Sequence, residues 1–275
     1  MNNFFQRLLT GIGYIVLLAG SVLSGKYFYG ILFLAITILT LYEYFRLFSG
    51  SPYKVQYGAG LITGGLIFLL SFLVFSGTAD LIYLNLIIPV ILVVFILELH
   101  RNKDHPFIAS ALLVLGWLYI AVPYALSVCL VFPEANNHSY TPGILLGLLA
   151  LIWLNDTGAY VVGMLFGKHR LFERISPKKS WEGAIGGTVF TIGLGVFLNR
   201  FTPFLTRFDW IMLSIIVSVF GVYGDLFESM LKRNMNIKDS GNLLPGHGGI
   251  LDRMDSLLFI IPASFAYLIL ISAVH

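Results

Sequence analysis

Long apolar runs separated by short polar loops make up most of this 275-residue sequence. The hydrocarbon core of a bilayer requires about 20 consecutive apolar residues in a helix, and nine stretches approach that length. The predicted spans are 8–25, 27–47, 57–77, 80–99, 108–132, 143–167, 182–199, 209–232 and 251–274. Their periodicity is weak because several faces of each helix must be apolar, so length and composition carry the prediction. We therefore predict an all-α fold, a polytopic transmembrane bundle of about nine spanning helices.

The composition excludes a soluble domain. Hydrophobic residues form 57% of the chain, charged residues only 11%, and the mean hydropathy is +0.86. Cys129 is the single cysteine, which excludes an intrachain disulfide and a cysteine-based zinc site. The first run, with Arg7 as its basic flank, also suits a signal peptide, but no small-x-small cleavage site follows it. We expect an uncleaved first helix.

The basic residues predict the orientation of the helices. With nine spans, thirteen of the 17 basic residues fall on one side, three on the other, and Arg253 lies at the start of the last span. The thirteen are Arg7, Arg46, Lys54, Arg101, Lys103, Lys168, Arg170, Arg174, Lys178, Lys179, Lys232, Arg233 and Lys238; the three are Lys26, Arg200 and Arg207. Basic loops stay in the cytoplasm, so we predict a cytoplasmic N-terminus. The net charge of +3 then reflects topology and is no evidence for nucleic-acid binding.

The polar content divides the predicted membrane-embedded domain, residues 1–275, into two halves. Residues 1–150 are scaffold-like spans with short loops, and residues 151–275 carry most of the chemistry-bearing groups. In the first half, Glu43 and Glu98 lie near inner helix ends. We expect them to reach water there, or to pair with the nearby Arg46 and Arg101.

Small-residue pairs with four-residue spacing let helices approach closely. Gly60 with Gly64 and Gly183 with Gly187 have this spacing, and close packing within the chain is the favoured interpretation. A subunit interface is the alternative, so the sequence leaves a homodimer open.

Carboxylates inside the predicted spans are the strongest functional signal, because an ionised group in the bilayer is costly and faces a wet cavity, a cation or a partner charge. Asp156, Asp225 and Asp252 all fall in the cytoplasmic half of their predicted helices. Hard oxygen ligands without cysteine point to magnesium or a similar cation. The alternative is a set of ion pairs that join helices. We favour metal for Asp225 and Asp252.

Helical spacing gathers further polar groups beside these carboxylates. Asp225, Glu228, Ser229 and Lys232 share one face of the eighth span, and Asp252, Asp255 and Ser256 share one face of the ninth. For Asp156, Glu228 and Asp255, metal binding and ion pairing remain equal alternatives.

Two loops offer phosphate-binding groups. The loop "KDSGNLLPGHGGILDRMDS", residues 238–256, has glycines that bring bare backbone amides near a ligand, with basic residues around them. His247 in this loop is either a structural hydrogen bonder or a group that orients a phosphate. The loop "SPKKSWEG" precedes a helix N-terminus and offers hydroxyl and ammonium groups from Ser176, Lys178, Lys179 and Ser180. Ser180 is alternatively only the cap of that helix.

Residues 229–255, "SMLKRNMNIKDSGNLLPGHGGILDRMD", resemble the signature of phosphatidate cytidylyltransferases, also called CDP-diacylglycerol synthases. The matching positions are Ser229, Lys232, Arg233, Lys238, Asp239, Gly241, Leu244, Pro245, His247, Gly248, Gly249, Asp252, Arg253 and Asp255. The block with Asn155-Asp156, Gly167-Lys168 and residues 176–183 is also similar to that family. The resemblance covers about the last 120 residues.

The resemblance implies transfer of CMP from CTP to phosphatidate, giving CDP-diacylglycerol and pyrophosphate. It implies that Asp225 and Asp252 hold Mg²⁺, with a monovalent cation such as K⁺ as a second ion. Together with the residue chemistry it predicts a catalytic set of Asp225, Asp252, Lys232, Arg233 and His247. The predicted substrate-binding set is Ser176, Lys178, Lys179, Ser180, Ser229, Lys238, Asp239, Gly248, Gly249 and Arg253.

Two other functions remain as alternatives. A CTP-dependent lipid kinase would use similar groups but transfer the terminal phosphate, and an ion-coupled transporter would also have buried carboxylates. Clustering of the acidic groups near one membrane face argues against the transporter. The expected partners are CTP, phosphatidate and the bilayer, in a bacterial inner membrane with the active site facing the cytoplasm.

Overall fold

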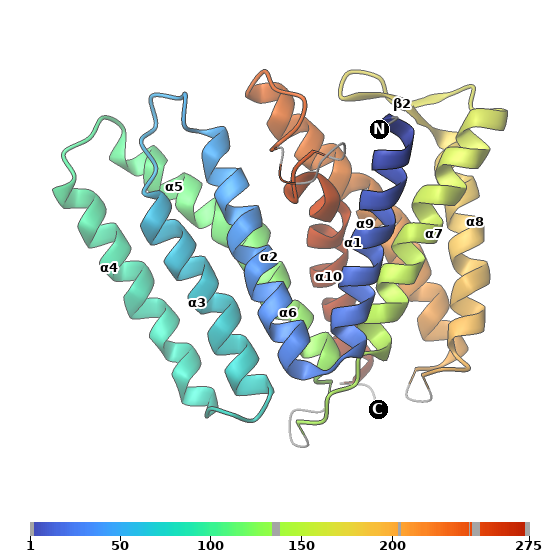
Figure 1. Ribbon diagram of the computed structural model, residues 1–275, viewed down its shortest axis with the longest axis horizontal. Coiled ribbons are helices and arrows are strands. Elements are labelled where there is room, and N and C mark those ends of the chain that lie inside the picture. The colour runs from blue at the N-terminus through green and yellow to red at the C-terminus, as the bar shows by residue number, and fades with distance from the viewer. Residues whose placement is uncertain (1–2, 134–137, 203–204, 242, 244–247, 273–275) are drawn as a thin grey trace. The chain divides into compact units, whose positions relative to one another are not determined.

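The computed structural model describes residues 3–133, 138–202, 205–241, 243 and 248–272, and nearly all of its regular structure is helical (Figure 1). Its elements are α1 (Asn3–Leu23), α2 (Lys26–Leu47), α3 (Tyr57–Phe75), η1 (Leu81–Leu86), α4 (Ile87–His100), α5 (Pro106–Gly116), η2 (Trp117–Ala121), α6 (Val122–Val131), α7 (Gly143–Phe166), β1 (Arg170–Phe172), β2 (Ser176–Ser180), α8 (Trp181–Leu198), α9 (Arg207–Asn234) and α10 (Leu251–Ser272). Each of the nine predicted spans coincides with a helical segment.

Eight helical segments of the described chain are long and apolar enough to cross a membrane. Two of them are composite: η1 continues into α4 over 81–100, and α5, the π-helical turn η2 and α6 run together over 106–131. In α1 the described apolar stretch is the shorter segment Leu9–Leu23. The predicted all-α polytopic membrane fold is confirmed, and the chain is an integral membrane protein. The cytoplasmic N-terminus stays a prediction.

The chain forms two compact units. The first comprises residues 1–140 and 239–253, and the second comprises residues 141–238 and 254–275. Helix α10 therefore begins in the first unit and continues in the second.

Aromatic side chains form much of the core of the first unit. Helix α2 packs against α3, and α3 against α6. Tyr29 of α2 is fully buried, and its ring is tilted against that of Phe33 with the two centroids 4.5 Å apart. Its hydroxyl lies 2.6 Å from that of Ser127 on α6. Trp117 at the π-helical turn donates to the carbonyl of Gly60 at 2.9 Å. These buried polar atoms have partners, as burial requires.

Small residues bring the helices of the second unit together. Helix α7 packs along α8, and α8 along α9 (Figure 1). A Cβ atom on Gly187 would lie only 2.8 Å from the backbone oxygen of Asn155, so α7 and α8 approach at a distance that only glycine permits. Thr191 on α8 then donates to the Asn155 side chain at 3.3 Å. The predicted close packing at Gly183 and Gly187 is confirmed.

The start of α9 follows from a capping box. The Thr206 hydroxyl accepts from the backbone N–H of Asp209 at 3.2 Å, while the Asp209 carboxylate accepts from the Thr206 N–H at 2.7 Å. Tyr267 of α10 donates to the same carboxylate at 2.8 Å. Acidic capping of this kind also suits the positive end of the helix dipole.

Candidate active site

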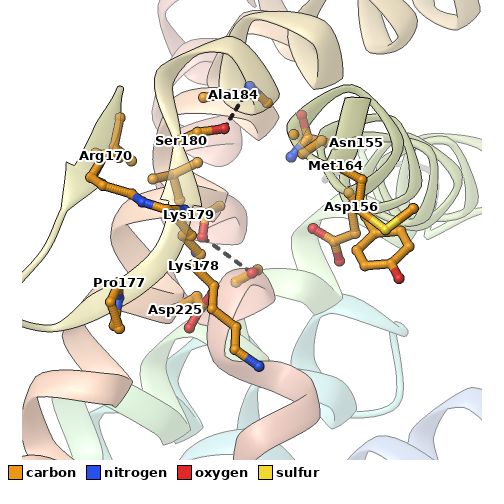
Figure 2. A pocket seen from close by; sticks show the side chains of 18 residues that line it. Asn155, Asp156, Met164, Arg170, Pro177, Lys178, Lys179, Ser180, Ala184 and Asp225 are labelled. Atoms are coloured by element: carbon orange, nitrogen blue, oxygen red, sulfur yellow. Dashed lines mark hydrogen bonds and ion pairs between the residues drawn. The ribbon is translucent and has the colours of Figure 1, made fainter. Parts of the chain in front are cut away.

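The second unit contains a cavity of about 510 Å³ with polar and apolar walls. Its lining comes from α7, the β-hairpin, the start of α8, α9 and α10. Figure 2 shows Arg170, Lys178 and Lys179 on the hairpin side of the cavity, and Asn155 and Asp156 of α7 across from them. Carboxylates, ammonium groups and a guanidinium therefore meet in one chamber bounded by membrane helices.

The β-hairpin carries three of the predicted phosphate-binding residues to this cavity. Strands β1 and β2 pair antiparallel, with Arg170 opposite Ser180. Lys178, Lys179 and Ser180 line the cavity, whereas Ser176 pairs with Phe172 in the hairpin and is half-buried. The loop was predictable from the sequence but its strands were not, because the five-residue stretch "SPKKS" has no apolar alternation.

Ser180 and Glu182 fasten the hairpin to α8. The Ser180 hydroxyl accepts from the Gly183 N–H at 3.2 Å, so Ser180 caps α8, and its predicted phosphate contact stays a prediction. The Glu182 carboxylate accepts from the backbone N–H of Lys168 at 3.1 Å and from His169 Nδ1 at 2.6 Å. Both ends of the hairpin are thereby tied to the N-terminus of one helix.

Asp225 on α9 is the central carboxylate of the cavity wall. It forms an ion pair with Lys179 of the hairpin, and its Oδ1 accepts from the Ser229 hydroxyl at 3.2 Å. Both partners of the ion pair remain about one-third exposed, at 28% for Lys179 and 32% for Asp225. One turn further along, Lys232 lies 2.6 Å from Glu228, which is only 1% exposed. The predicted shared face of α9 is confirmed, and its carboxylates form one ion pair with the hairpin and one within α9 itself.

Asp225, Glu228 and Asp255 form an acidic cluster in which one carboxylate oxygen of each lies within 4.8 Å of the others. Gly224 makes this proximity feasible, since a Cβ there would lie 2.6 Å from the backbone oxygen of Asp255. The Ser256 hydroxyl adds a bond to the Gly221 carbonyl at 3.1 Å. Helices α9 and α10 thus touch through their backbones, next to the carboxylates.

The acidic cluster fits a hard divalent cation. Carboxylate oxygens are the preferred ligands of magnesium, and this cluster offers three that are close enough to share one ion. Lys179 and Lys232 supply positive charge to two of these carboxylates. The same carboxylates can therefore bind a metal ion or form a network of ion pairs. These are the two alternatives that the sequence left open.

Asp252 belongs to the first unit, where its carboxylate binds backbone N–H groups of the signature loop, residues 238–256. Its Oδ2 accepts from the backbone N–H of Gly249 at 2.7 Å and of Ser240 at 3.0 Å. Gly248 between them has φ +84°, a conformation that favours glycine. Asp225 lies in the second unit, so a metal site shared by Asp225 and Asp252 stays a prediction.

The remaining predicted site residues are mostly exposed. Arg233, Lys238, Asp239 and Arg253 lie at the surface of their units, and the Arg253 carbonyl accepts from Tyr14 at 3.3 Å. The Arg233 guanidinium donates to the Ile237 carbonyl at 3.5 Å. His247 lies outside the described residues. The catalytic roles predicted for Arg233 and His247 and the substrate-binding roles predicted for Lys238, Asp239 and Arg253 stay predictions.

Two features, one in each unit, could not be predicted from the sequence. Arg170 lines the cavity, although its charge suggested only membrane topology. Glu43 is the second: the prediction that it reaches water or pairs with Arg46 is wrong, because it is 1% exposed and accepts hydrogen bonds from the signature loop. Glu98, in contrast, pairs with Arg101 at 2.9 Å as predicted. No local pattern around Glu43 distinguishes it from Glu98.

Sequence relatives agree with this chemistry. Residues 5–271 match the profile of the cytidylyltransferase family. The chain is 33% identical to the phosphatidate cytidylyltransferase of Bacillus subtilis (strain 168), over 99% of this chain and 100% of that protein. Phosphatidate cytidylyltransferases of Staphylococcus haemolyticus (strain JCSC1435) and Staphylococcus aureus (strain COL) are 49% and 48% identical over 114 residues, which cover 41% of this chain and 44% of each relative. With a match along nearly its whole length, this membrane protein belongs to the cytidylyltransferase family.

Proposed function

We propose that this chain is a phosphatidate cytidylyltransferase, which transfers CMP from CTP to phosphatidate and releases pyrophosphate. A nucleotidyltransferase of phospholipid biosynthesis agrees with the family and with the membrane fold. The observation that carries the proposal is the cavity in which Asp225 and Asp156 face Lys178, Lys179 and Arg170 between membrane helices. Such a chamber suits a reaction between a charged nucleotide and a lipid phosphate.

The reaction requires charge neutralisation rather than a strong base. Phosphatidate is a phosphate monoester whose second pKa is about 6, so its attacking oxygen is already anionic at neutral pH. This oxygen attacks the α-phosphorus of CTP, a new P–O bond forms, and the bond to pyrophosphate breaks. Two anionic groups must therefore meet in line, and cations are needed to oppose their repulsion.

The acidic cluster is the proposed metal centre. Asp225 with Glu228 and Asp255 would hold Mg²⁺, and Asp252 is proposed as a further ligand on the strength of the signature motif alone. A bound magnesium ion neutralises phosphate charge and orients the reacting groups. A second, monovalent ion such as K⁺ rests only on the family resemblance.

The basic residues are proposed to bind phosphate groups. Lys179 forms an ion pair with Asp225, and it would be available to the triphosphate if a cation held that carboxylate. Lys178 and Arg170 lie in the same cavity wall and bind the nucleotide phosphates. The signature residues Lys232, Arg233, Lys238 and Arg253 hold the charge that develops on pyrophosphate, and His247 orients a phosphate.

Apolar side chains in the cavity lining suit the lipid substrate. Tyr160 and Met164 of α7 line the cavity and are 65% and 66% exposed, which places apolar surface next to the charged groups. Acyl chains can thus remain in the bilayer while the phosphate reaches the cations. We propose that the site faces the cytoplasm, where CTP is available, across the inner membrane of a bacterial cell.

Labelled CTP distinguishes this reaction from its rivals. The purified chain in lipid nanodiscs is incubated with phosphatidate, magnesium and CTP labelled at either the α- or the γ-phosphate. We expect α-label in the lipid product and γ-label in released pyrophosphate. Lipid carrying γ-label would indicate a lipid kinase, and unlabelled lipid from both nucleotides would refute transferase activity.

A further inference from the structure

Glu43 of α2 has no role in the proposed chemistry, yet its carboxylate is fixed against the signature loop. Its Oε2 accepts from the Leu251 N–H at 2.8 Å and from the Ser240 hydroxyl at 3.2 Å. These donors lie 208 and 197 positions further along the chain, near the two ends of the segment 240–251. One carboxylate therefore binds both Ser240 and Leu251.

The loop is shaped to admit this side chain. A Cβ atom on Gly249 would collide with Oε2 of Glu43, and one on Gly241 would collide with Oε1. Both positions belong to the signature motif, and both leave room for the carboxylate because they are glycines. The Glu43 residue is 1% exposed, so hydrogen bonds from Ser240 and Leu251 replace water at Oε2, while Oε1 is buried without a hydrogen-bond partner among the described residues.

Glu43 and Asp252 both accept hydrogen bonds from Ser240. The Ser240 hydroxyl donates to Glu43, while the Ser240 N–H donates to Asp252. Leu251, the other partner of Glu43, directly precedes Asp252 at the N-terminus of α10. The two hydrogen-bond donors of Glu43 are therefore closely linked to Asp252: Ser240 also donates to Asp252, and Leu251 is its neighbour in the chain.

We propose that Glu43 is a positioning residue, which sets the Asp252 carboxylate through Ser240 and Leu251. The inference rests on the proposed function, since Asp252 has its catalytic role only there. Glu43 touches no substrate in this arrangement and acts entirely through the loop. Partners that orient a metal-site ligand are typically worth about 10- to 100-fold in activity or metal affinity.

Glu43→Gln is the direct test, because it keeps the size of the side chain and replaces the charged acceptor of both bonds with a weaker, neutral amide oxygen. We expect kcat to fall about 10- to 100-fold and the magnesium concentration for half-maximal activity to rise. Ser240→Ala removes one of the two contacts without introducing a clash, and we expect a smaller change in the same direction. Hydrogen exchange should also become faster in peptides that cover 239–253.

Glu98→Gln is the matched control. Glu98 is also a buried glutamate of the first unit, at 3% exposed, but it pairs with Arg101 and Gln56 rather than with the loop. Its variant should leave kcat, magnesium dependence and loop exchange at wild-type levels.

Two outcomes separate the inference from the proposed function. Wild-type protein that transfers no α-label would refute the function, and the exchange measurement would still decide whether Glu43 holds the loop. Active wild-type protein with unchanged magnesium dependence and loop exchange in Glu43→Gln would overturn the inference. A loss of activity that only follows the fraction of folded protein would overturn it as well.

Discussion

At the scale of single residues, Asp225 joins the cavity wall to the acidic cluster, because it lines the cavity and lies within 4.8 Å of two other carboxylates. We expect Asp225→Asn to lower specific activity by at least about 100-fold at saturating magnesium, since losing a proposed metal ligand would remove preorganised positive charge from the reacting phosphates, and one such interaction contributes about that much. The variant should still insert and purify. Asp80→Asn, the same change at an exposed position, is the control. Near-normal turnover by Asp225→Asn would remove this residue from the metal centre.

A substitution at Lys179 tests whether this residue binds phosphate or serves only in a structural ion pair. Its pair with Asp225 is about one-third exposed, and such pairs contribute only about 0–1 kcal/mol to stability. A hydrogen bond to a charged group contributes about 1.5–3 kcal/mol, so Lys179→Ala should raise the KM for CTP about 10- to 100-fold. The melting temperature should barely change. Lys103→Ala removes an exposed cation elsewhere and should leave KM unaltered; the same KM in both variants would refute the phosphate role.

Lys232 differs from Lys179 because its partner is buried. Glu228 is 1% exposed and lies 2.6 Å from the Lys232 ammonium group. Removing one partner of a buried pair leaves an uncompensated charge and typically costs about 3–5 kcal/mol. Lys232→Ala should therefore lower the thermal stability measurably, and Glu228→Gln as a second change should restore most of it. A double variant as unstable as Lys232→Ala alone would show that the pair is not the cause.

At the scale of elements, the contact between α9 and α10 sets the spacing of the acidic cluster. A Cβ on Gly224 would lie 2.6 Å from the Asp255 carbonyl, so Gly224→Ala should push the helices apart. Overpacking of this kind costs about 1–3 kcal/mol. We also expect a higher magnesium requirement. Gly193→Ala on α8 meets nothing within 4 Å and should be neutral or stabilising. Equal behaviour of the two variants would contradict a spacing role for Gly224.

The elements differ in how far they can be predicted from the chain. Every span was predictable because about 20 apolar residues in a row have few alternatives to a membrane helix. The hairpin was not, since Arg170–Phe172 and Ser176–Ser180 are too short for a periodic signal. The face shared by Asp225, Glu228, Ser229 and Lys232 follows directly from helical spacing. The structure shows a hydrogen bond from Ser229 to Asp225 and an ion pair between Lys232 and Glu228 on this face.

At the scale of the whole molecule, long-range partners were the part of the site that the sequence could not reveal. Local spacing predicts neighbours within one helix, whereas Lys179 meets Asp225 and Glu43 meets Leu251 only after folding. Glu43 and Glu98 have the same local context, near the end of an apolar run, yet one joins the signature loop and the other an arginine. The helix packing that selects their partners depends on shape, which composition does not encode.

The orientation of the whole chain is a separate prediction with its own test. Positive charge is retained in the cytoplasm, and the loops divide thirteen basic residues against three. In a Cys129→Ser background, a membrane-impermeant maleimide added to intact cells should label Arg200→Cys but not Lys103→Cys. Both should react once the membrane is opened, which controls for access, since both positions are exposed. Labelling of Lys103→Cys alone in intact cells would show that the topology is the reverse of the predicted one. It would also place the basic hairpin residues on the side that lacks CTP, so the proposed reaction would lose its nucleotide supply.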